Sequence, residues 1–189
     1  GAYPTNIATN YNPNWGQSGF CCVNPAFNPG TGNVIMEYKT FNYQGTELTP
    51  TNASSMTYLN FDIWTNAIPT ATTIQVSPIN FGTGAAEVLV TVPYTSGGWT
   101  RVSLPKSLFT GMTWNDVRQL KFAANGPNSI VPVDIYLDNI YFSTCGPTAP
   151  STSPSNPTCA AANVINIFSG TYPTNIATNY NPNWGQSGF

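Results

Sequence analysis

Histidine is absent from this chain of 189 residues, and charged side chains of either sign are scarce. Without histidine the chain lacks the general base of a Ser-His-Asp triad and the commonest protein ligand of metal ions. Five Lys and Arg residues against seven Asp and Glu residues leave a net charge of −2, which argues against a nucleic-acid-binding face. Two carboxylates facing across a cleft would serve a glycosidase, but seven acids in any chain give only a weak signal. We therefore expect no enzyme.

Long apolar runs are also missing, since none approaches the roughly 20 residues that a membrane-spanning helix requires. The chain is nevertheless 41% hydrophobic and 13% aromatic, which is enough to build a sizeable core. Its polarity comes mainly from uncharged Asn, Thr, Ser and Gln residues. This composition suits an extracellular or cell-surface protein with no membrane span.

The two ends of the chain carry almost the same twenty residues. GAYPTNIATNYNPNWGQSGF opens the sequence and GTYPTNIATNYNPNWGQSGF closes it, with one difference, Ala2 against Thr171. Gly170 repeats Gly1, so the two blocks start 169 residues apart. A period of this length is that of a whole domain rather than of a solenoid unit. The pattern predicts a tandem repeat, with the start of a second copy at the C-terminal end.

Four cysteines support an oxidising environment and predict two disulfides. They are Cys21, Cys22, Cys145 and Cys159. A bridge between the adjacent pair would be strained, because successive side chains on an extended strand point to opposite faces. We expect Cys21 and Cys22 each to reach a different partner, Cys145 or Cys159. A Cys145–Cys159 bridge remains open as an alternative.

The chain divides into three parts by composition. Residues 1–142 are strand-like runs broken by Gly, Pro and Asn, and residues 143–162 form a Ser/Thr/Pro-rich linker of semi-extended character. Residues 163–189 read as a first strand, Asn163–Ser169, followed by the entry loop of the next repeat. The copy that begins at Gly1 then lacks its own first strand, and strand donation between copies becomes possible. The residues predicted for an inter-repeat joint are Trp15, Ile165, Ile167, Phe168 and Trp184.

Alternating residues over residues 56–65 predict a β-strand with one buried face. Leu59, Phe61 and Ile63 face the core in this interpretation. Similar β-type runs separated by turn residues recur along the chain, and no sustained helical period accompanies them, which predicts an antiparallel β-sandwich or jelly roll. The further runs cover residues 34–43, 72–81, 87–94, 99–105, 118–124 and 133–142.

The order of these runs resembles a known family. YKTFNYQGTEL, MTYLNFDIWT, GGWTRVSLPKSLFTG, RQLKF and VDIYLDNIYF follow one another as in jelly-roll, galactose-binding-like domains of the carbohydrate-binding-module type, found in secreted bacterial proteins. The resemblance implies an extracellular sandwich, a glycan ligand and no catalysis. It also implies a structural calcium ion near the first and last strands, for which Asp138 is the matching acid.

A sugar-binding surface combines aromatic faces with a few placed polar groups. Cross-strand aromatic pairing is the competing interpretation for the outward residues of such a strand. For Trp99, at a strand start, core packing is favoured. The residues predicted to bind carbohydrate are Tyr58, Asn60, Asp62 and Trp64, on the outward face of residues 56–65, and Trp114 in a loop. For Trp114, packing within a helical turn is an equally open interpretation.

Two functions follow from these patterns. The first is a non-catalytic structural repeat of an extracellular filament, stalk or adhesin, built from β-sandwich domains of the carbohydrate-binding type. Its partners are neighbouring copies of the chain, locked together by disulfides, with strand donation as a second way of joining them. The alternative is a true carbohydrate-binding module that targets a polysaccharide within a secreted glycan-degrading protein. The repeated block favours the first, and the family resemblance favours the second.

Overall fold

The computed structural model describes residues 6–84, 86–125, 133–147 and 160–163. By its contacts the chain forms two units, Gly1–Pro147 and Thr148–Phe189. The described part of the second unit is a single short 3-10 helix, η3 (Ala161–Asn163). Asn163, the first residue of the predicted strand Asn163–Ser169, thus lies in a 3-10 turn, and the rest of that segment falls outside the described residues.

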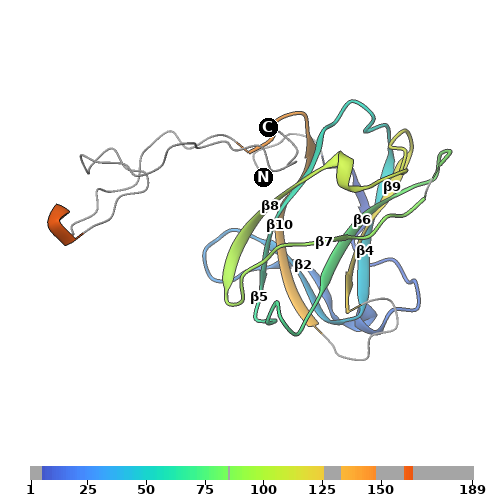
Figure 1. Ribbon diagram of the computed structural model, residues 1–189. Coiled ribbons are helices and arrows are strands. Elements are labelled where there is room, and N and C mark those ends of the chain that lie inside the picture. The colour runs from blue at the N-terminus through green and yellow to red at the C-terminus, as the bar shows by residue number, and fades with distance from the viewer. Residues whose placement is uncertain (1–5, 85, 126–132, 148–159, 164–189) are drawn as a thin grey trace. The chain divides into compact units, whose positions relative to one another are not determined.

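The first unit is an antiparallel β-sandwich of the jelly-roll type, as predicted (Figure 1). Two five-stranded sheets face one another, and every pairing between named strands is antiparallel among the described residues. The first sheet has the order β1 (Ala8–Asn10), β4 (Tyr43–Thr51), β9 (Val117–Ala124), β6 (Ile74–Asn80), β7 (Val90–Thr91). The second sheet has the order β2 (Val23–Phe27), β3 (Ile35–Phe41), β10 (Val133–Ser143), β5 (Tyr58–Thr65), β8 (Gly98–Pro105).

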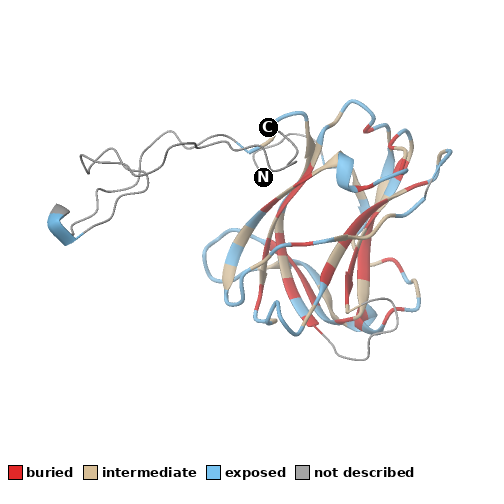
Figure 2. Ribbon diagram, viewed as in Figure 1, coloured by how far each residue is buried: buried red, intermediate tan, exposed pale blue. Residues whose placement is uncertain are grey.

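The core fills the space between the two sheets. Leu59, Phe61 and Ile63 of β5 are fully buried, as the alternation predicted. The Phe61 ring meets Phe122 of β9 edge to face, with ring centroids 5.2 Å apart and planes at 89°. Since these two rings come from opposite sheets, their contact marks the middle of the sandwich, where the buried residues gather in Figure 2.

Trp15 lies on the domain's own first sheet. Its ring covers Gly45 of β4 so closely that a Cβ added there would come 2.6 Å from Trp15 Cη2. The Trp15 carbonyl also accepts a 2.8 Å hydrogen bond from the Tyr43 hydroxyl. Trp15 is therefore already packed within its own unit, and its place in an inter-repeat joint stays a prediction. The other predicted joint residues, Ile165, Ile167, Phe168 and Trp184, lie outside the described residues.

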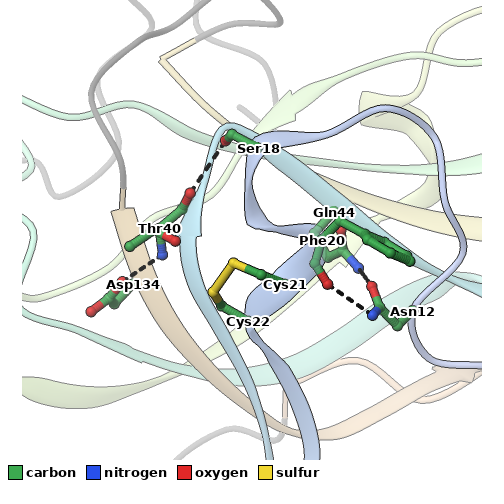
Figure 3. The surroundings of a disulfide bond; sticks show 8 residues. All are labelled: Asn12, Ser18, Phe20, Cys21, Cys22, Thr40, Gln44 and Asp134. Atoms are coloured by element: carbon green, nitrogen blue, oxygen red, sulfur yellow. Dashed lines mark hydrogen bonds between the residues drawn. A yellow bond between two sulfur atoms is a disulfide. The ribbon is translucent and has the colours of Figure 1, made fainter.

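The predicted cysteine pairing was wrong, because Cys21 and Cys22 are bonded to each other with an S–S distance of 2.00 Å (Figure 3). They do not lie on an extended strand, which was the premise of the prediction. They end a 3-10 helix, η1 (Ser18–Cys22), where successive side chains no longer alternate between opposite faces. Cys145 is a free, exposed thiol, and Cys159 lies outside the described residues.

The turn that carries the disulfide is packed tightly against β3. An added Cβ at Gly19 would come 2.8 Å from Cβ of Phe41, so only glycine fits there without a shift. Ser18 Oγ donates to the Thr40 carbonyl at 3.2 Å, and Asn12 Nδ2 donates to the Phe20 carbonyl at 3.0 Å (Figure 3). These contacts at Ser18, Gly19 and Phe20, directly before the cysteine pair, hold η1 in place.

Candidate ligand-binding face

The outer face of the second sheet carries an aromatic row, defined here as Trp99, Trp64, Tyr136 and Phe27. Trp64 of β5 is the direct cross-strand partner of Trp99 on β8 and of Tyr136 on β10. The Trp64 and Tyr136 rings lie 5.4 Å apart at 72°, and the Tyr136 and Phe27 rings lie 5.2 Å apart at 50°. The row therefore crosses the sheet from its edge strand β8 to β2, at right angles to the strands.

Glu37 of β3 lies in the same row as Tyr136 and is buried, although it is an acid. Burial, together with a hydrogen bond to Glu37, raises the pKa of the Tyr136 hydroxyl above its ordinary value. The phenol thus stays protonated and donates to the carboxylate. This bond fixes the Tyr136 ring beneath any ligand that stacks on the row.

Next to the aromatic row lies a charged row, defined here as Arg101, Asp62 and Asp138. These residues face one another across β8, β5 and β10. Arg101 binds Asp62 through two hydrogen bonds, Nε to Oδ1 at 2.9 Å and Nη2 to Oδ2 at 3.1 Å. Asn139 Nδ2 donates to Asp62 Oδ2 at 2.8 Å. Such a two-point bond orients the guanidinium and the carboxylate side by side on the surface.

Two grooves flank the aromatic row. One, of about 530 Å³, lies over the charged row, and the loop that precedes β3 forms its wall. The other, of about 440 Å³, lies on the far side of Trp64 and Tyr136. The first is lined by Pro29, Thr31, Asn33, Ile35, Asp62, Trp99, Arg101 and Asp138. The second is lined by Thr40, Trp64, Thr65, Asn66, Ala67, Thr72, Val133, Asp134 and Tyr136.

The ion pair in the charged row makes stability depend on pH. The hydrogen bonds from Arg101 hold the pKa of Asp62 below its ordinary value. Their contribution is fully present above the ordinary carboxyl pKa and is lost as the pH falls through the lower folded-state pKa. Because the Arg101 side chain is 78% exposed, we expect this contribution to be about 1 kcal/mol or less. Urea unfolding at pH 7 and pH 2.5 should show a smaller pH-dependent loss in Asp62→Asn than in the parent chain.

The variant Arg101→Met provides the second arm of this measurement. It leaves the carboxyl group but removes the guanidinium that lowers its pKa. The pH-dependent loss should shrink in Arg101→Met, but less than in Asp62→Asn, because the hydrogen bond from Asn139 to Asp62 remains. An unchanged pH dependence in both variants would contradict the assignment.

The predicted sugar-binding residues of β5 do not act as one exposed strip. Trp64 and Asp62 take part in the aromatic and charged rows. Asn60 is on the same outer face but is buried, and it bonds Ser103 Oγ at 2.6 Å and Ser143 Oγ at 2.8 Å. Tyr58 is half-buried and its ring lies against Gly146, where an added Cβ would come 2.7 Å from it. Asn60 therefore ties strands together instead of facing a ligand.

Of the two interpretations of Trp114, exposure as a sugar-binding residue is wrong, and the ring packs inward instead. Only 2% of it is exposed. Its ring lies between Phe109 and Phe142, at 5.4 and 5.6 Å between centroids, in edge-to-face geometry. The loop that carries Trp114 folds over the open end of the sandwich and turns the ring inward. Trp114 thus belongs to the core.

Trp99 was expected in the core but is 51% exposed. The register of β8 on β5 explains the difference, because Val102 and Leu104 take the inward positions and Trp99 falls on the opposite face. The alternation Trp99, Arg101, Ser103 was available in the sequence and could have placed it correctly.

A calcium ion at Asp138 does not fit the described residues. Both carboxylate oxygens already accept N–H donors, Oδ2 from Asn33 Nδ2 at 2.8 Å and Oδ1 from the Asn139 backbone amide at 2.7 Å. Calcium requires six to eight oxygen ligands. Within the described ranges, no three His, Cys, Asp or Glu side chains come together as a metal site. Asp138 instead holds the loop before β3 and the bulge at Asn139.

No family model matches the chain, and no curated protein matches it. In the part of the chain that the structure describes, no helix has the length and apolar character needed to cross a membrane.

Comparison with solved structures finds carbohydrate-binding modules. The Family 11 module of a cellulosomal cellulase of Clostridium thermocellum is 16% identical, with a TM-score of 0.49 over 80% of this chain and 94% of that one. A module specific for non-crystalline cellulose is 10% identical, with a TM-score of 0.43 over 62% of this chain and 80% of that one. A Family 16 carbohydrate-binding module is 15% identical, with a TM-score of 0.40 over 72% of this chain and 99% of that one. These carbohydrate-binding modules are what the chain is similar to in structure.

Proposed function

We propose that this chain is a non-catalytic carbohydrate-binding module of an extracellular protein, and that it binds a neutral polysaccharide along the aromatic row. The observation that carries the proposal is the row itself, in which Trp99 is exposed and the other three rings are half-buried, with a groove on either side. Aromatic rings offer flat apolar faces to the C–H faces of sugar rings. Carboxylate, guanidinium and amide groups beside the rings can form hydrogen bonds with the sugar hydroxyls. A row that spans several strands is long enough for more than one sugar unit.

The charges in the two grooves favour a neutral glycan over an acidic one. Asp134 lines one groove and Asp138 the other, while Arg101 is already joined to Asp62. Uronic-acid or sulfated polymers would meet two carboxylates with no further described cation in either groove lining. Neutral hydroxyls can both donate to these carboxylates and accept from Arg101 and Asn33.

Binding to a panel of polysaccharides tests the proposal. Affinity electrophoresis and isothermal titration calorimetry would compare neutral glucans, xylans, mannans and xyloglucan with acidic pectin and alginate. Trp99→Ala and Trp64→Ala should each weaken binding at least about tenfold, which corresponds to ~1.4 kcal/mol, because each removes a stacking face. Phe81→Ala is the matched control, since Phe81 is an equally exposed aromatic outside the row. Full affinity in both tryptophan variants, or no binding to any neutral glycan, would overturn the proposal.

The structural-repeat function remains a second prediction from the sequence. It rests on the repeated block of twenty residues, and no contact within the described residues favours it over glycan binding. The two are compatible, because a module that binds glycan weakly gains avidity when several copies are linked.

A further inference from the structure

The last part of β10 has no neighbouring strand on its β3 side, although β10 is the central strand of the second sheet. β10 pairs with β5 up to Ser143, but its register with β3 ends at Leu137. β3 starts only at Ile35, and the chain before it turns away, held by the hydrogen bond from Asn33 to Asp138. Beyond Leu137 no other described strand borders β10 on the β3 side. We call the surface formed there by Asn139, Ile140 and Phe142 the β10 shoulder.

The β10 shoulder is apolar, and the bulge at Asn139 is the feature that interrupts its edge. Ile140 is 38% exposed, and Phe142 is half-buried against Trp114. Natural proteins blunt unpaired edges with Lys, Pro or a covering element. Neither lysine nor proline occurs between Leu137 and Ser143. An apolar backbone edge of this kind fits an added β-strand.

The sequence itself supplies a strand of suitable character. The segment Asn163–Ser169, NVINIFS, stands directly before Gly170, the residue that repeats Gly1. It has no charge and alternates Ile165 and Ile167 with Asn166. These two isoleucines can extend the apolar layer formed by Ile140 and Phe142, because period-two residues share one face of a strand.

From these observations we infer that the β10 shoulder is a docking site for the Asn163–Ser169 segment of a second copy of this chain. The segment adds to the second sheet as a strand beside β10, and each copy completes the sandwich of its neighbour. This surface is separate from the aromatic row, so its test does not depend on glycan binding.

A labelled peptide, NVINIFSG, tests the docking site directly. It is titrated into the full chain carrying Ile165→Asp and Ile167→Asp, whose own segment can no longer compete. We expect saturable binding by fluorescence anisotropy and new protection of β10 amides from hydrogen exchange. Adding Ile140→Lys, in β10, should weaken peptide binding at least tenfold. Ile68→Lys changes a 59% exposed isoleucine in a loop away from β10 and should leave peptide binding unchanged. No saturable binding, or equal affinity with Ile140→Lys, would overturn the inference.

Analytical ultracentrifugation of the parent chain identifies the donor. If a second copy donates the strand, the parent chain associates as its concentration rises, and the variant with Ile165→Asp and Ile167→Asp stays monomeric. A parent chain that is monomeric at every concentration while the variant binds the peptide would mean that the segment folds back on its own chain. That outcome would refute donation by a second copy.

Discussion

Truncation of Trp114 to alanine is expected to lower the free energy of unfolding by about 3–5 kcal/mol, the range found for buried tryptophan and phenylalanine. The ring fills the end of the sandwich between Phe109 and Phe142 and also lies 5.5 Å below Lys106 Nζ. Removing it leaves a cavity that strands and loops cannot easily fill. Urea unfolding followed by circular dichroism measures the loss.

Trp114→Phe is the informative companion variant. Among the described residues, Trp114 Nε1 is the single buried side-chain nitrogen or oxygen without a hydrogen-bond partner. Phenylalanine keeps most of the ring and removes this unsatisfied N–H group, so part of the lost packing is offset. We expect Trp114→Phe to cost less than half of what Trp114→Ala costs. If Trp114→Ala left stability unchanged but abolished glycan binding, the original prediction of a surface sugar-binding role would be restored.

Gly45→Ala is expected to destabilise the sandwich by about 2–3 kcal/mol, at the upper end of overpacking effects. The added Cβ would lie 2.3 Å from the Leu120 carbonyl oxygen and 2.6 Å from the Trp15 ring. The first of these is backbone of the paired strand β9, so it cannot rotate away. The Trp15 ring must then leave the sheet or the two strands must separate.

Gly98→Ala is the matched control for this variant. Gly98 also lies in a strand, but nothing approaches within 4 Å of the position where its Cβ would stand. The melting temperature of Gly98→Ala should stay within a degree or two of the parent value or rise slightly, because alanine restricts the unfolded chain. Equal destabilisation by the two substitutions would show that the close approach of Trp15 and Leu120 is not the cause.

Periodicity was sufficient to predict the sandwich and the inward face of β5, because Leu59, Phe61 and Ile63 alternate with polar residues and become buried. It was not sufficient for β4, whose sequence YQGTELTPT lacks apolar alternation. That strand nevertheless pairs with β9, and Trp15, from a distant loop, covers its outer face at Gly45. A partner so far away in sequence leaves no local pattern.

The sequence indicated only part of the candidate ligand-binding face, and the binding roles of its residues stay predictions. Trp64 and Asp62 were identified from β5 alone, but the aromatic row depends on the register that sets Trp99 and Tyr136 beside Trp64. Register comes from the long-range pairing of β5 with β8 and β10, which a single strand does not specify. Trp114 and Asn60 were misjudged for the same reason, since what covers them comes from other segments.

The bond between Cys21 and Cys22 has a consequence for how the domain responds to reducing conditions. A disulfide stabilises a protein chiefly by lowering the conformational entropy of its unfolded chain. This effect grows with the number of residues in the loop that the disulfide closes. This bridge joins neighbours in sequence and encloses no loop, so it leaves the entropy of the unfolded chain almost untouched. Its breakage would alter one surface turn, while the sandwich would keep the stability that its core provides. Reduction of the Cys21–Cys22 bond alone is therefore expected to leave the free energy of unfolding of the sandwich nearly unchanged.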